Sequence, residues 1–190
     1  MKTTLSIDVR YAPVLDAGFV PAVLWNRAYR ARVAEQGGRM LELALVRPEG
    51  TAFRWSGEVL PAGAGHDELT VKYVERLVKF LLWQKGGSRI LVAGAPDVAQ
   101  ALAGMYCAGG RQQFDWEFIG GRIFGENISV AAVAAADLPD EKSAAIELGR
   151  HLDGCRIGFD LGGSDRKCAA VIDGEVVFSE EVAWDPYFQS

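Results

Sequence analysis

The stretch RIGFDLGGSDRKCAAVIDGEVVFSEEV, residues 156–182, holds three apolar runs separated by two glycine-containing turns. The runs Arg156–Phe159, Lys167–Ile172 and Glu175–Val182 have the length and composition of β-strands. Asp173-Gly174, between the second and third runs, is a strong hairpin signal, because both residue types accept the positive φ of a type I′ turn. The stretch therefore predicts three consecutive antiparallel strands.

The first turn, Asp160-Leu161-Gly162-Gly163-Ser164, has the composition of a phosphate-binding turn. Asp160 ends a strand and can hold Mg²⁺ directly or through water, since hard cations prefer oxygen ligands. Gly162 and Gly163 permit unusual backbone angles and let the chain approach a ligand closely. Their N–H groups, with the N–H and hydroxyl of Ser164, can surround phosphate oxygens, and Lys167 adds positive charge. A glycine β-turn without a ligand is the alternative for so short a pattern.

The turn leads into a strand, whereas the P-loop and the dinucleotide-binding fingerprint both open a helix, so neither motif applies. Residues 157–182 resemble instead the N-terminal phosphate motif of the ROK family (repressors, open reading frames and sugar kinases), within the actin–hexokinase–Hsp70 superfamily. The matching positions are Asp160, Gly162, Gly163, Ser164 and Lys167. Arg166 stands where the family more often has an apolar residue. The resemblance covers only roughly the last 35 residues of the chain.

The resemblance implies a function in ATP-dependent phosphoryl transfer to a sugar hydroxyl. By analogy, Asp160 would serve Mg²⁺ and residues 162–164 would bind the phosphates of ATP, so the implied ligands are a nucleotide and, in an enzyme, a sugar. The family's catalytic aspartate, its sugar-binding histidine motif and its cysteine-rich zinc motif are not found in this sequence. Since phosphoryl transfer needs a positioned base and an aligned acceptor, we expect no kinase activity from this chain alone. A non-catalytic actin-like module that binds a sugar or nucleotide is the alternative.

Residues 1–153 predict a separate α/β domain. Expected strands are Leu5–Val9, Met40–Val46, Thr51–Leu60, Arg89–Ala93, Asp115–Ile119 and Ile128–Ala135, and expected helices are Glu68–Lys85, Asp97–Cys107 and Glu141–Leu152. For the alanine-rich run Ile128–Ala135 a helix is the alternative. The resulting order, roughly β-β-β-α-β-α-β-α, is the ribonuclease-H-like order of actin-type domains. The resemblance implies that a second, actin-like ATPase domain begins at residue 154, and the strands expected there lack a covering helix up to residue 190. We therefore expect that this second domain continues beyond the sequence given.

Composition narrows the class of protein. The chain has 190 residues, 49% of them hydrophobic, and a net charge of −5, which argues against a broad nucleic-acid surface. No apolar run approaches the roughly 20 residues of a membrane span. Three cysteines without a CxxC pair predict reduced thiols, and with no secretory leader they predict a cytoplasmic protein. The oligomeric state stays open, a homo-oligomer included.

Overall fold

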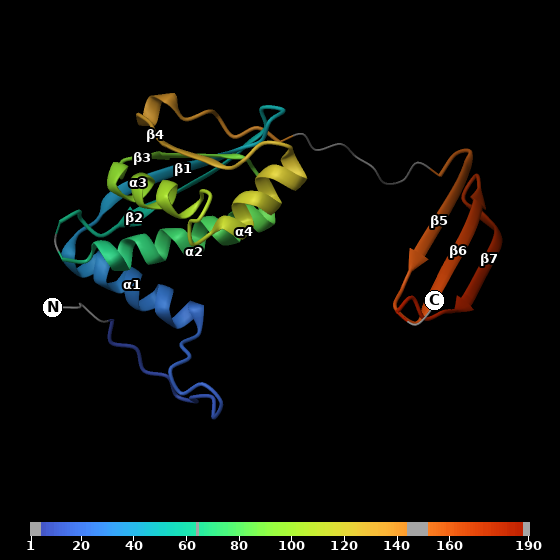
Figure 1. Ribbon diagram of the computed structural model, residues 1–190, viewed down its shortest axis with the longest axis horizontal. Coiled ribbons are helices and arrows are strands. Elements are labelled where there is room, and N and C mark those ends of the chain that lie inside the picture. Colours follow the sequence, from blue (N-terminus) through green and yellow to red (C-terminus); the bar gives the residue numbers. More distant parts are fainter. Residues whose placement is uncertain (1–4, 64, 144–151, 188–190) are drawn as a thin grey trace. The chain divides into compact units, whose positions relative to one another are not determined.

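The computed structural model describes residues 5–63, 65–143 and 152–187. Contacts divide the chain into two compact units, Met1–Ala144 and Ala145–Ser190, which we call unit 1 and unit 2 and describe separately. Unit 1 is a layered α/β structure, and unit 2 is a three-stranded sheet (Figure 1). The mixed α/β class predicted from the sequence is confirmed.

Unit 1 is built on a four-stranded sheet in the order β2-β1-β3-β4. The strands are β1 (Arg39–Val46), β2 (Ala52–Val59), β3 (Arg89–Ala93) and β4 (Ser129–Ala132). β1 runs antiparallel to both β2 and β3, and β3 runs parallel to β4, as expected when a helix-containing segment connects two strands. The β1–β2 hairpin closes through a turn in which the Gly50 N–H donates to the Arg47 carbonyl, with Gly50 at φ +84°. These four strands were all predicted from the sequence.

Helices cover one face of this sheet, with α1 and α2 lying side by side beneath the strands in Figure 1. They are α1 (Ala22–Gln36), α2 (Asp67–Lys85), α3 (Pro96–Met105), the short α4 (Gln113–Asp115) and a π-helix, η1 (Trp116–Phe124). Alternate β1 residues, Leu41, Leu43 and Leu45, point into the main core beneath these helices. The intervening Ala44 and Val46 contact a smaller cluster that Leu138 covers after a 3-10 helix, η2 (Ala135–Asp137).

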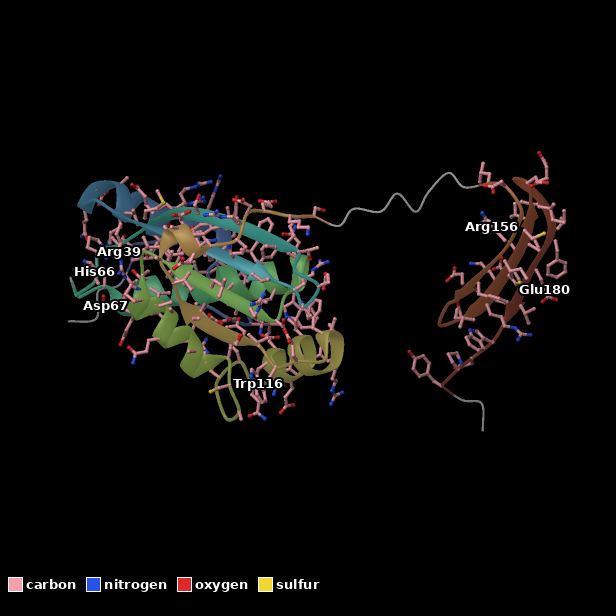
Figure 2. All side chains as sticks on the ribbon, turned by 90° about the horizontal axis from the view of Figure 1, so that it is seen from above. Arg39, His66, Asp67, Trp116, Arg156 and Glu180 are labelled. Carbon is pink, nitrogen blue, oxygen red and sulfur yellow. The ribbon has the colours of Figure 1, made fainter. Side chains whose placement is uncertain are left out.

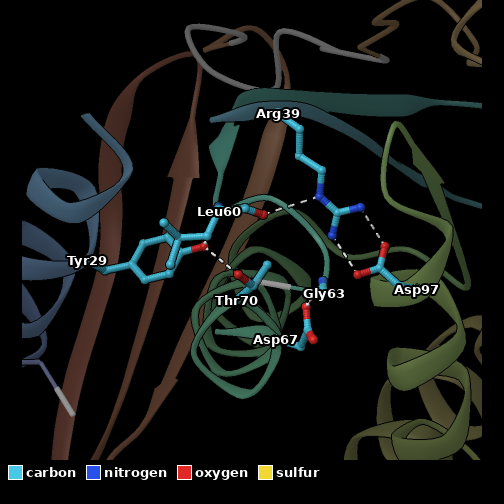
Figure 3. A network of polar contacts seen from close by, with 7 residues as sticks. All are labelled: Tyr29, Arg39, Leu60, Gly63, Asp67, Thr70 and Asp97. Atoms are coloured by element: carbon cyan, nitrogen blue, oxygen red, sulfur yellow. Dashed lines mark hydrogen bonds and ion pairs between the residues drawn. The ribbon is translucent and has the colours of Figure 1, made fainter. Parts of the chain in front are cut away.

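A polar network joins α1, the start of α2, β1 and α3 (Figure 3). The buried Tyr29 hydroxyl donates to Thr70 Oγ1 at 3.0 Å and accepts the Leu60 N–H at 3.2 Å. Arg39 binds both carboxylate oxygens of Asp97, at 2.7 and 2.5 Å, and its Nε donates to the Leu60 carbonyl. Figure 2 shows Arg39 at the same end of unit 1 as His66 and Asp67, where α2 begins. The network therefore connects the N-terminal ends of α2 and α3 with the start of β1 and the residue that follows β2.

Two predictions at the N-terminal end of the chain are wrong. The expected strand Leu5–Val9 is not formed; Leu5 and Ile7 pack their side chains on the core without strand pairing. The helix α1 was not expected at all. Its buried residues, Trp25, Tyr29 and Val33, recur every four residues, and the rings of Trp25 and Tyr29 stack on Tyr73 of α2. The described unit thus begins with a helix where the ribonuclease-H-like order has a strand.

The expected strand Asp115–Ile119 is also wrong, because these residues belong to α4 and η1. Asp115 and Ile119 are both buried, a spacing of four that suits a helix, and Asp115 accepts a hydrogen bond from Trp83 Nε1. Gly120 permits this helix to lie against the following backbone, since a Cβ there would come within 2.5 Å of the Ile128 nitrogen. A wider helix with a glycine contact replaces the expected extended chain.

The expected helix Glu141–Leu152 lies mostly outside the described residues. Its described first residues are not helical. The Lys142 N–H donates to the Ala52 carbonyl at 2.9 Å, and the Ala52 N–H donates to the Lys142 carbonyl at 3.0 Å. This pair of bonds fastens residues 141–143 to the start of β2.

Unit 2 consists of β5 (Cys155–Leu161), β6 (Asp165–Ile172) and β7 (Glu175–Ala183), paired antiparallel in chain order. The hairpin turn has φ +50° at Asp173 and +87° at Gly174, which confirms the positive φ values that the sequence predicted. A β-bulge between Ala170 and Val171 shifts the pairing of β6 with β7 by one residue. The three predicted strands are confirmed, and they are longer than predicted by three, two and one residues for β5, β6 and β7.

Candidate functional site

A row of charged residues crosses unit 2 beside the glycine turn. Asp160 on β5 lies directly opposite Lys167 on β6, and Lys167 lies directly opposite Glu181 on β7. Directly opposite residues of antiparallel strands share a face, so all three side chains project on the same side. Asp165, two residues before Lys167, projects there as well. Four of the charged side chains near the turn are therefore gathered on one face.

A row of small residues adjoins the charged row. Gly158, Ala169 and Ser179 are paired across the same three strands, two residues further from the turn. Because these side chains barely rise above the backbone, the face is hollowed there. The hollow has a volume of about 380 Å³, and its lining includes Asp160, Lys167 and Glu181. We call this hollow with its charged edge the β5–β7 depression.

The glycine turn itself connects β5 to β6 as a short loop over residues 162–164. Neither Gly162 nor Gly163 has a positive φ, so the unusual backbone angles expected there are not found. Gly162 instead serves a close approach, since a Cβ at this position would lie 3.0 Å from the Asp165 carbonyl oxygen. Among the described residues, no turn hydrogen bond is donated by the N–H groups of Gly162, Gly163 or Ser164. These three donors are thus not used by the protein's own turn bonds.

Trp184, which follows β7, holds the turn from the other side. Its indole Nε1 donates to the Gly162 carbonyl at 2.7 Å, and its backbone N–H donates to the Ser164 carbonyl at 3.0 Å. Both bonds occupy carbonyl oxygens and leave the N–H groups of the turn untouched. The Ser164 hydroxyl donates to Asp165 Oδ2 at 3.2 Å. The turn is therefore fixed through its acceptors, an arrangement that keeps donors available for an anion.

Lys167 is held by carboxylates. Its Nζ lies 3.2 Å from Asp165 Oδ1 and 3.8 Å from Glu181 Oε1. The hydrogen bond with Asp165 raises the pKa of Lys167, and the charges of Asp165, Glu181 and Asp160 raise it further. Lys167 is consequently a firmly charged ammonium in an acidic surrounding. Three carboxylates against one ammonium make this face anionic, which disfavours an unaccompanied phosphate.

The opposite face of the sheet is mostly apolar, although Arg166 and Glu180 also lie on it. Ile157, Phe159 and Leu161 alternate with Asp160 along β5 and are exposed within unit 2, as is Phe178 on β7. Figure 2 shows the side chains of β5–β7 standing out from both faces of the sheet, with Arg156 and Glu180 labelled. One face is therefore suited to polar chemistry and the other to packing.

The residues present suit a Mg²⁺ ion only in part. Within the described residues, no group of three or more His, Cys, Asp or Glu side chains could hold a metal ion. Asp160 offers one carboxylate, and Mg²⁺ commonly takes one or two protein carboxylates while phosphates and water complete its six ligands. A Mg²⁺ ion that arrives with nucleotide phosphates therefore fits this site, and a metal held by the protein alone does not.

All five sequence-predicted site residues lie at one place: Asp160 and Lys167 are opposite each other, next to the turn that contains Gly162, Gly163 and Ser164. Sequence reasoning did not find three further residues that contact them: Asp165, Glu181 and Trp184. The alternation of β6 could have placed Asp165 on the face of Lys167. The positions of Glu181 and Trp184 beside the turn depend on the β-bulge, and no pattern in the local sequence indicates them.

Comparisons with known proteins found no matching family model, no matching curated protein and no matching solved structure. No helix among the described residues has the length and apolar character needed to cross a membrane.

Proposed function

We propose that unit 2 binds the phosphates of MgATP through residues 160–164 and Lys167, as the opening strands of an actin-like ATPase domain in a cytoplasmic, ROK-like sugar kinase. The observation that carries the proposal is the placement of three uncommitted turn N–H groups beside the opposed pair Asp160 and Lys167. The N–H groups would bind phosphate oxygens, Lys167 would neutralise charge, and Asp160 would contribute a ligand to Mg²⁺.

The electrostatics of the face make the role of the metal specific. Because Asp160, Asp165 and Glu181 surround the single Lys167, free ATP is repelled more than MgATP. The proposal therefore requires that binding depend on Mg²⁺. A face that bound ATP equally well in the presence of a chelator would act through unspecific charge attraction, which its own charges oppose.

The actin-like assignment for unit 2 is supported by the order strand, glycine turn, strand, hairpin, strand, which fits the resembled motif. For unit 1 the ribonuclease-H-like assignment has less support, because its expected first strand is not formed and β3 runs antiparallel to its neighbour β1. We therefore rest the proposed function on unit 2 alone.

The test is a titration of the 190-residue chain with MgATP, followed by two-dimensional ¹⁵N NMR. We expect saturable shifts of the Gly162, Gly163 and Ser164 amides, and no saturation when Mg²⁺ is chelated. Asp160→Asn should weaken binding at least five-fold. Glu175→Gln is the matched control, because it too removes one negative charge from unit 2, but Glu175 lies on β7 at the end of the sheet that holds the Asp173-Gly174 turn.

Two results would overturn the proposal. Binding that Asp160→Asn leaves unchanged would remove Asp160 from the site, and equal weakening by Glu175→Gln would reduce the effect to net charge. Kinase activity is tested separately, with a coupled assay for ADP release in the presence of hexoses. We expect no sugar-dependent turnover from this chain, because the catalytic aspartate and the sugar-binding histidine motif of the resembled family are not found in this sequence.

A further inference from the structure

A second, smaller cavity lies in unit 1, at the end of the sheet where the β1–β2 hairpin turns. It has a volume of about 170 Å³ and opens between three segments that are distant in sequence. One is the hairpin, one is the C-terminal end of α2, and one is the segment 141–143 that pairs with Ala52. Each segment contributes one basic side chain to the lining: Arg47, Lys85 and Lys142.

Arg47 is held in place before any ligand binds. Its Nε donates to the Lys85 carbonyl at 3.0 Å, and its Nη2 donates to the same oxygen. These bonds cap the C-terminal end of α2, where unpaired carbonyls carry partial negative charge. Its Nη1 lies 3.8 Å from Glu49 Oε1, a contact at which both side chains are about half exposed. The guanidinium thus cancels the negative helix end and keeps its position at the cavity.

One contact holds the side chain of Lys85, and backbone bonds hold the segment that carries Lys142. Lys85 Nζ lies 5.1 Å from the centre of the Phe53 ring, which also lines the cavity. The segment that carries Lys142 is fixed by the two backbone bonds with Ala52. Among the described residues of the lining, Glu141 is the one carboxylate, and Glu49 lies beside Arg47. Counting both carboxylates, the three cations still leave the surroundings of the cavity positive.

We propose that this cavity binds a small tetrahedral dianion, either inorganic phosphate or the phosphoryl group of a small metabolite. Three like charges gathered from three segments repel one another, and an anion between them relieves that repulsion. Arg47 offers planar N–H donors that suit phosphate oxygens, and the lysines add point charges. The volume admits one such group and excludes a whole nucleotide, so this site differs in ligand from the turn in unit 2.

The test uses inorganic phosphate as the probe, with the full chain and NMR detection at constant ionic strength. We expect saturable shifts of amides near Arg47, Ala52 and Lys85. Chloride at the same ionic strength should produce none of them. Lys85→Gln/Lys142→Gln should weaken phosphate binding at least ten-fold. Lys142→Gln alone should weaken phosphate binding at least three-fold. Because this side chain is exposed and the backbone bonds of Lys142 remain, the single variant tests the proposal even if the double variant does not fold.

The control is Lys72→Gln/Arg76→Gln, which removes two positive charges from α2 where they lie over the Trp25 ring, away from the cavity. Equal weakening in the control, equal shifts with chloride, or shifts confined to residues 162–164 would each overturn the proposal. Asp160→Asn should leave phosphate binding here unchanged, so failure of the unit 2 site and failure of this one are distinguishable. Competition between inorganic phosphate and glycerol 3-phosphate identifies the source: tighter binding of the ester favours a metabolite, and its exclusion favours free phosphate.

Discussion

Lys167 lies between two acidic residues of one cross-strand row, Asp160 on β5 and Glu181 on β7. In the proposed site the two carboxylates have opposite consequences. Asp160 would assist Mg²⁺, whereas Glu181 attracts the ammonium group away from a phosphate and repels the phosphate itself.

Glu181→Gln is therefore expected to strengthen MgATP binding by about three-fold, and Lys167→Gln to weaken it by about the same factor, since each removes one exposed charge. Titration of both variants beside the parent chain measures the two effects. Weakened binding in Glu181→Gln would show that the carboxylate takes part in the site, contrary to its proposed role as a competitor.

How far the sequence predicts this site depends on the β-bulge. With a two-residue turn at Asp173-Gly174 and regular pairing, Lys167 would lie opposite Glu180. The bulge between Ala170 and Val171 moves the pairing by one residue, so that Glu181 takes that place and Trp184 reaches the glycine turn. The local sequence predicts the turn and strands, but the position of a bulge depends on the whole sheet.

The failures in unit 1 have a similar cause. The strand expected at Asp115–Ile119 alternates in hydrophobicity, but a partly buried hydrogen bond from Trp83 to Asp115 and the close contact at Gly120 stabilise a π-helix there. The bond joins residues 32 positions apart, and the Gly120 contact depends on how the chain turns back at residues 126–128, so the pattern of Asp115–Ile119 itself contains neither. In α1, by contrast, the spacing of Trp25, Tyr29 and Val33 was available and indicates a helix beginning after Pro21. The main hairpin and α2 were predictable because their apolar patterns and turns agree.

Asp97→Asn is expected to destabilise unit 1 at pH 7 by about 1 kcal/mol, because it removes one oxygen of a bidentate charged pair that is partly open to solvent. The hydrogen bond from Arg39 lowers the pKa of Asp97. A lowered folded-state pKa adds stability above the unfolded pKa of 3.8, and this stability is lost as the pH falls through the folded-state value. The difference between parent and variant should therefore shrink below about pH 4. Urea unfolding at pH 7 and pH 3 measures it, with the exposed Asp137→Asn as the control. A difference that stays constant with pH would contradict the assignment.

Tyr106→Phe is expected to leave stability at pH 7 unchanged or to raise it by up to about 1 kcal/mol. Within the described residues, the buried Tyr106 hydroxyl has no hydrogen-bond partner. Its removal therefore removes the free-energy cost of burying a polar group without a hydrogen bond. Burial raises the pKa of Tyr106, and the charges of Asp115 and Glu75 raise it further. Because the folded-state pKa is raised, the ionisation of Tyr106 does not affect the free energy of unfolding below about pH 10. Above that pH the unfolded state ionises first, so the protein loses stability as the pH rises. The variant should therefore lose less stability than the parent between pH 9 and pH 11.

Tyr29→Phe is the matched comparison, because its hydroxyl donates to Thr70 and accepts from the Leu60 N–H. This variant should cost about 1 to 2 kcal/mol at pH 7, since it leaves two buried partners without their bond. Denaturant unfolding of both variants measures the two free energies of unfolding, and so compares a hydroxyl that has hydrogen-bond partners with one that has none among the described residues. If Tyr106→Phe were the more destabilising of the two, the Tyr106 hydroxyl would have a partner that these contacts do not reveal.

Gly94→Ala is expected to destabilise unit 1 by about 3 kcal/mol or more, because the strain of a positive φ and a clash with the backbone act together. Gly94 has φ +77°, and a Cβ there would lie 2.2 Å from the Met40 carbonyl oxygen, where β1 and β3 meet. Substitutions at two other glycines separate the cost of backbone strain from the cost of the clash. Gly109 has φ +74° with no atom within 4 Å of an added Cβ, so Gly109→Ala should cost only the strain of about 1 kcal/mol. Gly104 lies inside α3 with open space around it, so Gly104→Ala should stabilise by about 0.5 to 1 kcal/mol. Thermal unfolding of the three variants tests this order, and a Gly94→Ala protein as stable as Gly109→Ala would mean that β1 and β3 can separate at Met40 without loss of the sheet.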